Sequence, residues 1–309
     1  TVGQCTPGIN DMDGDGLSDF VMVRNAAQRA VWTVKRNDLT ANGTVFPEFA
    51  LGTTTDQFLI GDFDGDGMGD PVAFRNGNPG RFSIRRSSRP DDRTLEIALG
   101  ATGDTPRVSG DYDGDRVTDA SVFRRASGAV LAYRQSGTGD LVTHAIPNAT
   151  GAFGLSLRDA NGNGKADFAL QSNAGNNMGQ FRVYDGLSGA QTDAFTLGNP
   201  THLVIPGQVT GTPRTDITVA GGVAGQINFT TRDLESGTEL PTVVFGQSAT
   251  DLLTPGDYDG DGLLDLSVWR ADAAPGASRF ITRLSTTQAT LEVPAGEAGQ
   301  YAVNNWDVH

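Results

Sequence analysis

The chain has 309 residues, and its 37 acidic side chains against 23 basic ones give a formal net charge of −14. This negative excess argues against nucleic acid or an anionic membrane surface as the main partner. No apolar run reaches the length of a membrane span, which argues against membrane insertion. The 41 glycines and 14 prolines separate short β-branched and aromatic runs, a profile that predicts an all-β protein. The single cysteine, Cys5, excludes an intramolecular disulfide.

An acidic loop of nine residues recurs six times along the chain. Its pattern is Asp-x-Asp-Gly-Asp-Gly-x-x-Asp in the copies that begin at 11, 62 and 257, and the copy at 111 differs by Arg116 in place of the second glycine. The copy at 159 has Asn161 and Asn163 in place of two aspartates, and the copy at 208 keeps only Asp216. Successive copies start 51, 49, 48, 49 and 49 residues apart. Because the degraded copy is in phase, we interpret it as a true repeat that has lost its metal ligands.

Four strand-like runs accompany each loop. The first follows the last Asp and often ends in Arg, as in 20–24, 71–75, 120–124 and 266–270. A second alternating run comes after a turn, a third closes on Leu-Gly or Phe-Gly, and a fourth, such as 58–61, enters the next loop. Four short strands make one antiparallel sheet, which cannot bury both faces alone, so the sheets must stack around an axis. The sequence therefore predicts one domain over 1–309, a six-bladed β-propeller with an acidic loop between the first and second strands of each blade.

The two ends of the chain are expected to close the ring. Residues 300–307 stand where the entry strand of a seventh loop would stand, whereas Cys5–Gly8 forms a poor strand because it contains Pro and Gly. We therefore expect the C-terminal segment to be the innermost strand of the first blade, paired with the run from Phe20.

The chemistry of the loop favours a hard cation. Carboxylates at positions 1, 3, 5 and 9 and a backbone carbonyl at position 7 make an all-oxygen ligand set, which selects calcium over zinc or copper. An EF-hand begins in the same way but needs a bidentate Glu at position 12 and a helix on each side. Position 12 is apolar here and lies inside a β-type run, so the EF-hand alternative fails. The five acidic loops hold 18 of the 37 acidic residues, so metal sites account for the negative charge.

The pattern predicts four to five bound calcium ions. Arg116 is expected to strain the third loop and weaken its site, the Asn161/Asn163 loop is expected to bind more weakly, and the loop from Gln208 is expected to be empty. Replacing Asp64 or Asp259 by Ala is expected to destabilise clearly, and replacing Asp216 is expected to matter less. The predicted ligands are Asp11, Asp13, Asp15, Leu17 and Asp19; Asp62, Asp64, Asp66, Met68 and Asp70; Asp111, Asp113, Asp115, Val117 and Asp119; Asp159, Asn161, Asn163, Lys165 and Asp167; and Asp257, Asp259, Asp261, Leu263 and Asp265.

The loop, the hydrophobic strand, the Arg and the aromatic strand together resemble the FG-GAP/VCBS repeats of bacterial secreted proteins, and they are also similar to the cation-binding blades of the integrin α-subunit propeller. The resemblance covers nearly the whole chain. It implies calcium between the first two strands of a blade, a secreted or cell-surface location, and roles in adhesion, glycan binding or as an appendage of a larger enzyme. The repeats here are shorter than integrin repeats, and nothing implies an integrin partner subunit.

Three functions remain open at this point. A secreted binding module for a glycan or protein ligand is favoured, a purely structural propeller of a larger surface protein is the second, and a polysaccharide-acting enzyme is the third. Catalytic residues are not predicted, since His144, His202 and His309 are isolated and the paired aspartates are explained by metal. An arginine-rich stretch, Arg81 to Arg93, is interpreted as a charged outer strand that protects a sheet edge, with a grip on an acidic ligand as the alternative. The start at Thr1 fits a processed secreted protein or a trimmed chain, and we expect a monomer.

A ligand is expected to bind the face opposite the acidic loops. Successive connections in an antiparallel blade alternate between its ends, so the links between blades and the turns between second and third strands share that opposite face. These segments vary in length and composition, as expected of adaptable contacts on a rigid scaffold. They comprise the links 53–56, 101–105, 199–202 and 247–251 and the turns 76–80, 172–179 and 271–277.

Overall fold

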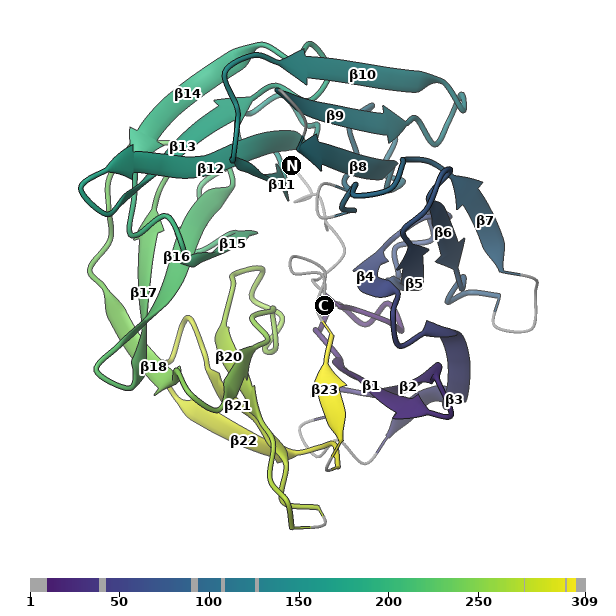
Figure 1. Cartoon of the computed structure of the whole chain (residues 1–309). Helices are drawn as coiled ribbons and strands as arrows, with labels where there is room; N and C mark the ends of the chain where they lie inside the picture. The colour runs from purple at the N-terminus through teal and green to yellow at the C-terminus, as the bar shows by residue number, and fades with distance from the viewer. Residues whose placement is uncertain are drawn as a thin grey trace.

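The computed structural model describes residues 10–38, 43–89, 94–106, 109–125, 128–274, 276–297 and 299–303. These residues form six antiparallel sheets arranged as blades around a central axis (Figure 1), and they contain no helix. The predicted all-β class and the six-bladed propeller are therefore confirmed. Every acidic loop precedes the second strand of its blade, counted from the axis outward.

Each blade follows the same strand order from the axis outward. The first contains β23 (Gln300–Ala302), β1 (Phe20–Ala26), β2 (Arg29–Lys35) and β3 (Thr44–Thr53); the second contains β4 (Gln57–Gly61), β5 (Asp70–Arg75), β6 (Arg81–Ile84) and β7 (Leu95–Ala98). The third contains β8 (Ala120–Arg125), β9 (Ala129–Arg134) and β10 (Leu141–Ile146); the fourth contains β11 (Phe153–Leu157), β12 (Asp167–Gly175), β13 (Met178–Tyr184) and β14 (Gln191–Thr196). The fifth contains β15 (Leu203–Gly207), β16 (Asp216–Val223), β17 (Gln226–Arg232) and β18 (Val243–Gln247); the sixth contains β19 (Asp251–Leu253), β20 (Leu266–Arg270), β21 (Arg279–Arg283) and β22 (Thr290–Pro294). In the third blade the innermost position is held by single bridges, Thr105 to Phe123 and Gly110 to Asp119.

Burial explains the sequence patterns of inner and outer strands. The second strand of a blade is covered on both faces by neighbouring blades, so β5 is buried along its length except at Arg75. The outer strands β7 and β14 alternate between half-buried and exposed residues, because only one face packs inward. Six apolar clusters fill the six junctions between blades, and each draws residues from two consecutive blades. At the first junction, for example, Trp32 of β2 meets Phe58 of β4 with ring centroids 5.3 Å apart.

The first blade is built from both ends of the chain. Strand β23 lies beside β1 in Figure 1 and pairs with it antiparallel, with Met22 opposite Ala302 and Val23 opposite Tyr301. The Val303 N–H donates to the Val21 carbonyl at 3.0 Å, and both Ala302 and Val303 are buried. The remainder of the strand expected over 300–307 and the segment Cys5–Gly8 lie outside the described residues.

Removing residues 299–309 should lower the melting temperature by at least about 5 °C. The deletion exposes the inner edge of β1 and removes buried apolar side chains from the junction between the sixth and first blades. Differential scanning calorimetry measures the shift, and a deletion of 304–309 alone is the matched control. A change below 1 °C for the longer deletion would show that β23 does not hold the ring closed.

Candidate metal centres

Four loops, which begin at 11, 62, 111 and 257, keep all four aspartates, and we call them the complete loops. In each of them the first carboxylate accepts hydrogen bonds from the loop backbone around it. In the loop between β4 and β5, Asp62 Oδ1 accepts hydrogen bonds from the N–H groups of Gly65 at 2.7 Å and Asp66 at 3.2 Å. Asp62 Oδ2 accepts from Gly67 at 2.9 Å. Both glycines have φ in the left-handed region, +76° and +87°, which is why the pattern keeps glycine there. The same contacts recur around Asp11, Asp111 and Asp257.

Arg116 adopts the left-handed conformation that glycine adopts in the other loops. Its φ is +74°, and its N–H still donates to Asp111 Oδ2 at 2.8 Å, so the loop keeps its shape with a strained residue. Arg116→Gly should therefore raise the free energy of unfolding by about 1 kcal/mol, less the entropy that a new glycine costs. Denaturant titration in calcium measures this gain, with Arg29→Gly as a control at an exposed arginine of ordinary φ. A loss of stability larger than the roughly 1 kcal/mol of entropy that a new glycine costs would show that the arginine side chain makes a contact worth more than the strain.

Carboxylate oxygens converge in the four complete loops. In each, one oxygen from each of three aspartates lies within 4.8 Å of the other two. Asp64 Oδ1 is in addition buried without a hydrogen-bond partner among the described residues. A buried acceptor without a donor is costly, and a cation would satisfy it. The residues of these four loops therefore fit a bound calcium ion. The groups are Asp11, Asp13 and Asp15; Asp62, Asp64 and Asp66; Asp111, Asp113 and Asp115; and Asp257, Asp259 and Asp265.

The aspartate at position 9 also fastens the loop to the rest of its blade. Asp70 is fully buried, and its Oδ2 accepts the N–H of Phe63 at 2.9 Å while its Oδ1 accepts the N–H of Ser87 at 2.6 Å. Ser87 belongs to the turn between the third and fourth strands. Equivalent pairs of contacts hold Asp19, Asp119, Asp167 and Asp265. Direct ligation by the position-9 carboxylates, by the position-7 carbonyls and by Asp261, which lies outside the converging group of its loop, stays a prediction.

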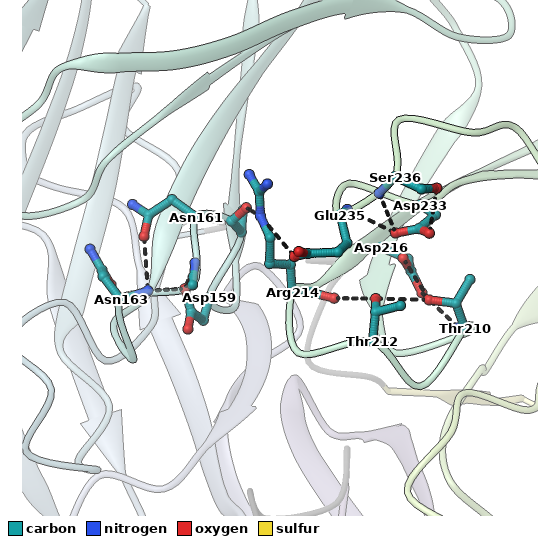
Figure 2. A network of polar contacts seen from close by, with 12 residues as sticks. Asp159, Asn161, Asn163, Thr210, Thr212, Arg214, Asp216, Asp233, Glu235 and Ser236 are labelled. Carbon is teal, nitrogen blue, oxygen red and sulfur yellow. Dashed lines mark hydrogen bonds and ion pairs between the residues drawn. The ribbon is translucent and has the colours of Figure 1, made fainter.

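This role explains why the degraded loop retains Asp216. Asp216 is fully buried, and its Oδ2 accepts from the N–H groups of Val209 and Thr210, both at 2.8 Å. Asp216 was expected to matter less than Asp64 or Asp259, because its loop has lost the other carboxylates. Its carboxylate nevertheless holds the loop backbone, a role that requires no metal. Figure 2 shows Asp216 among the threonines that replace the other loop carboxylates.

Burial raises the pKa of the position-9 carboxyls. The pKa of Asp19 and of Asp70 rises to about 7, and that of Asp119 and of Asp265 to about 6, with neighbouring loop carboxylates adding to the effect of burial. The unfolded chain has these groups near 3.9, so the folded metal-free protein binds more protons between about pH 4 and pH 7.

The metal-free protein should therefore lose stability as pH rises from 4 to 7. We expect its melting temperature in chelator to be higher at pH 5.5 than at pH 7.5, and bound calcium should cancel this trend because a cation favours the charged carboxylates. Thermal scans in chelator and in excess calcium at both pH values compare the two slopes. Greater stability at pH 7.5 in chelator would contradict the raised pKa values.

The turns between the third and fourth strands contribute side chains to the loops, and the loop pattern in the sequence did not predict these contacts. Ser88 Oγ donates to Asp64 Oδ2 at 3.1 Å, Ser136 Oγ to Asp115 Oδ2 at 2.9 Å, and Ser285 Oγ to Asp261 Oδ2 at 2.8 Å. In the first blade the turn contributes an arginine instead of a serine, and Arg36 Nε lies 2.6 Å from Asp13 Oδ2. A partial signal was present, because Ser87 and Ser136, whose N–H groups donate to the last Asp of their loops, each follow that Asp by 17 residues.

Consecutive loops are joined into a closed ring. The N–H at position 8 of each loop donates to the position-1 carbonyl of the preceding loop, at 2.5 to 2.8 Å, and Ser18 closes the circle onto Asp257. The position-7 side chain covers the glycine at position 4 of the preceding loop. A Cβ added to Gly14 would lie 3.2 Å from Met68 Cγ, and one added to Gly260 would lie 2.9 Å from Leu17 Cδ2. The loops thus form one continuous belt on one face of the propeller.

On the opposite face of the propeller, an ion pair between arginine and aspartate recurs in three blades. The arginine at the end of the second strand forms a bidentate ion pair with an aspartate in the link between blades, as in Arg124 with Asp104 at 2.7 and 2.8 Å. Arg75 pairs with Asp56 and Arg270 with Asp251 in the same way. The same aspartates accept link N–H groups. Three of the four links between blades that were expected to be adaptable are therefore held in place by charged hydrogen bonds. The remaining link, 199–202, has a weaker contact, in which His202 Nδ1 accepts from the Asn199 N–H at 3.4 Å.

The remaining candidates from the sequence have structural contacts. His144 Nε2 hydrogen bonds to the Gly186 carbonyl at 2.9 Å, while His309 lies outside the described residues. The interpretation of the arginine-rich stretch as an outer strand is wrong, because Arg81 lies on β6, the third strand of its blade, and β7 is the outermost. The Arg85 guanidinium lies over the Phe49 ring at 4.1 Å, and Arg81 pairs with Glu96. Arg93 lies outside the described residues. A cavity of about 270 Å³ between the second and third blades has the paired Arg124 and Asp104 as its charged lining.

Comparisons with known proteins support the fold. No family model matches the chain, and no curated protein matches it. Among solved structures the chain is similar to TolB from Acinetobacter baumannii, with 12% sequence identity and a TM-score of 0.57 over 95% of this chain and 66% of that one. A family PL11 rhamnogalacturonan lyase from Bacillus licheniformis aligns with 12% identity and a TM-score of 0.39 over 98% of this chain and 75% of that one.

These observations define the class of protein. The chain is a six-bladed β-propeller, and its likeness to TolB reaches the fold alone. It spans slightly less than two thirds of that TolB chain. Within the described residues there is no helix with the length and apolarity that a membrane crossing requires.

Proposed function

We propose that the chain is a calcium-stabilised binding module of the FG-GAP/VCBS repeat type, secreted or displayed on a cell surface. One observation carries the metal part of the proposal: three carboxylate oxygens converge within 4.8 Å at the same phase of four repeats. Clustered carboxylates repel one another until a cation binds, so calcium would act mainly on the stability of the fold. The four ions would lie along the belt of loops on one face.

The opposite face would contact a glycan or protein ligand. Four large apolar side chains are between 40% and 51% exposed at that end of the fourth and fifth blades: Phe153, Met178, Leu203 and Val223. Arg125 lies over the Phe153 ring at 3.4 Å, which leaves a charged group beside this apolar side chain. These exposed side chains would supply the apolar contacts of a ligand on that face.

A purely structural propeller within a larger surface protein is the second candidate. The ion pairs in the links between blades favour this structural role. Asp56, Asp104 and Asp251 hold three links in place, whereas a ligand-binding face would need adaptable links.

A glycan array probed with the labelled protein tests the binding module, and binding to no glycan would favour the purely structural propeller. Binding that is lost in the double variant Phe153→Ser/Met178→Ser, and retained in Leu187→Ser on the loop face, would support the binding module. Leu187 is a matched control because it is an apolar residue of similar exposure, 46%. Binding that survives the double variant and disappears in Leu187→Ser would place the ligand on the loop face instead.

A further inference from the structure

The fourth loop differs from the complete loops in the chemistry that faces its centre. Asn161 Oδ1 accepts the N–H of Asn163 at 3.0 Å, and Asn163 Oδ1 accepts the N–H of Lys165 at 2.9 Å. The aspartates at these positions in the first loop use Oδ1 in the same way. Only the oxygen of an amide accepts a hydrogen bond, so these contacts fix which way each asparagine points. The NH₂ groups therefore stand where the complete loops have a second carboxylate oxygen.

Both NH₂ groups point at one carboxylate from outside the loop. Asp185 Oδ2 accepts from Asn161 Nδ2 at 2.9 Å and from Asn163 Nδ2 at 2.8 Å. Asp185 begins the turn between β13 and β14, and its Oδ1 accepts the N–H of Ser188 at 2.7 Å. At the corresponding position, where the first residue of the turn accepts an N–H four residues later, the third blade has Gln135 and the sixth has Leu284. The loop thus presents donors to an anion, the reverse of a calcium site.

The fifth loop is closed by hydroxyl groups and an arginine. Thr210 Oγ1 donates to Asp216 Oδ2 at 3.0 Å and lies 3.0 Å from Thr212 Oγ1, and Thr212 Oγ1 donates to the Arg214 carbonyl at 3.4 Å. Figure 2 shows the Arg214 side chain reaching toward the preceding loop, which carries Asp159 and Asn161. There its Nε donates to the Ala160 carbonyl at 2.6 Å. The two loops are therefore held by one connected set of protein contacts.

We propose that the fourth and fifth loops are closed by protein groups in place of a cation, so that these two blades stay fastened when calcium is removed. Inward NH₂ groups repel a cation, and calcium requires oxygen ligands. Among the described residues, no three carboxylates converge at 159–167 as they do in the complete loops. The inference rests on the proposed function only where it contrasts these two loops with the four loops that would bind calcium. If it holds, the protein binds four calcium ions, the lower of the two predicted numbers.

The first experiment restores a complete loop. The triple variant Asn161→Asp/Asn163→Asp/Asp185→Gln removes the inward donors and copies Gln135 of the third blade. Isothermal titration of calcium into the metal-free protein should give four ions for the wild type and five for the variant. Five ions in the wild type, falling to four in Asp185→Asn, would overturn the proposal, because Asp185 would then be a calcium ligand.

The second experiment needs no calcium. Asp185→Asn should lower the melting temperature by about 3 °C or more in chelator, and by a similar amount in calcium, because it breaks a contact between protein groups. Asp140→Asn, at an exposed turn residue of the third blade, is the matched control. An effect of Asp185→Asn seen only in calcium would overturn the closure. Failure of the wild type to bind any ion would instead remove the proposed calcium sites, and the chelator experiment would still decide on the closure.

Discussion

Removing calcium should lower the melting temperature of the protein by roughly 20 °C or more. A site filled at a free concentration 100 times its Kd contributes about 2.7 kcal/mol of stability, so four sites contribute on the order of 10 kcal/mol, and each kcal/mol shifts the melting temperature by about 2–4 °C. That contribution is comparable with the whole stability of a typical domain. The physical cause is the repulsion among the three converging carboxylates in each complete loop.

Thermal scans by circular dichroism in excess calcium and in chelator measure this shift. Asp64→Ala or Asp259→Ala should each reduce the calcium-dependent part by about a quarter, since each removes one of four ligand sets. Asp140→Ala should leave it unchanged, because Asp140 is exposed and lies outside the loops. A melting temperature that is the same in chelator and in calcium would remove the metal interpretation.

Asp216→Ala should destabilise the protein by about 3 kcal/mol, although its loop has lost the other carboxylates. The substitution leaves the half-buried N–H groups of Val209 and Thr210 without their acceptor, and each unpaired donor costs about 1–3 kcal/mol. The expected fall in melting temperature is roughly 6–12 °C, equal in calcium and in chelator.

Denaturant titration of Asp216→Ala in both conditions checks the size and the calcium independence of the loss. Asp216→Asn is the informative companion, since its single oxygen keeps one acceptor and should restore part of the stability. A loss below 1 kcal/mol for Asp216→Ala would show that water replaces the carboxylate, and that position 9 does not fasten the loop.

Periodicity explains how much of the fold was predictable. The six loop copies fix the number of blades, and the position of each loop before a buried strand fixes which strands it joins. Closure of the ring by residues 300–303 was predictable from the same repeat, because these residues stand where the strand before a seventh loop would stand. The degraded copy at 208 was correctly placed as a blade because its phase survived the loss of its ligands.

Contacts between separate connections explain what the sequence could not show. Ser88, Ser136 and Asp185 meet the loops from turns about 20 residues away, and their places depend on how the third and fourth strands bend toward the loop. In the sequence, asparagine in place of aspartate at 161 and 163 indicates only a loss of negative charge. The structure shows in addition that each asparagine NH₂ donates a hydrogen bond to Asp185, where a carboxylate oxygen would only accept one. Likewise, the arginines at strand ends formed a visible pattern, but their aspartate partners lie in links whose conformation the pattern does not define.

The number of calcium ions bound per chain tests the central claim most directly. Equilibrium dialysis followed by elemental analysis should find four ions in the wild-type protein and three in Asp64→Ala, which loses both carboxylate oxygens of one ligand in the loop between β4 and β5. Binding of no calcium, or of the same number in both proteins, would contradict the assignment of a cation to each complete loop.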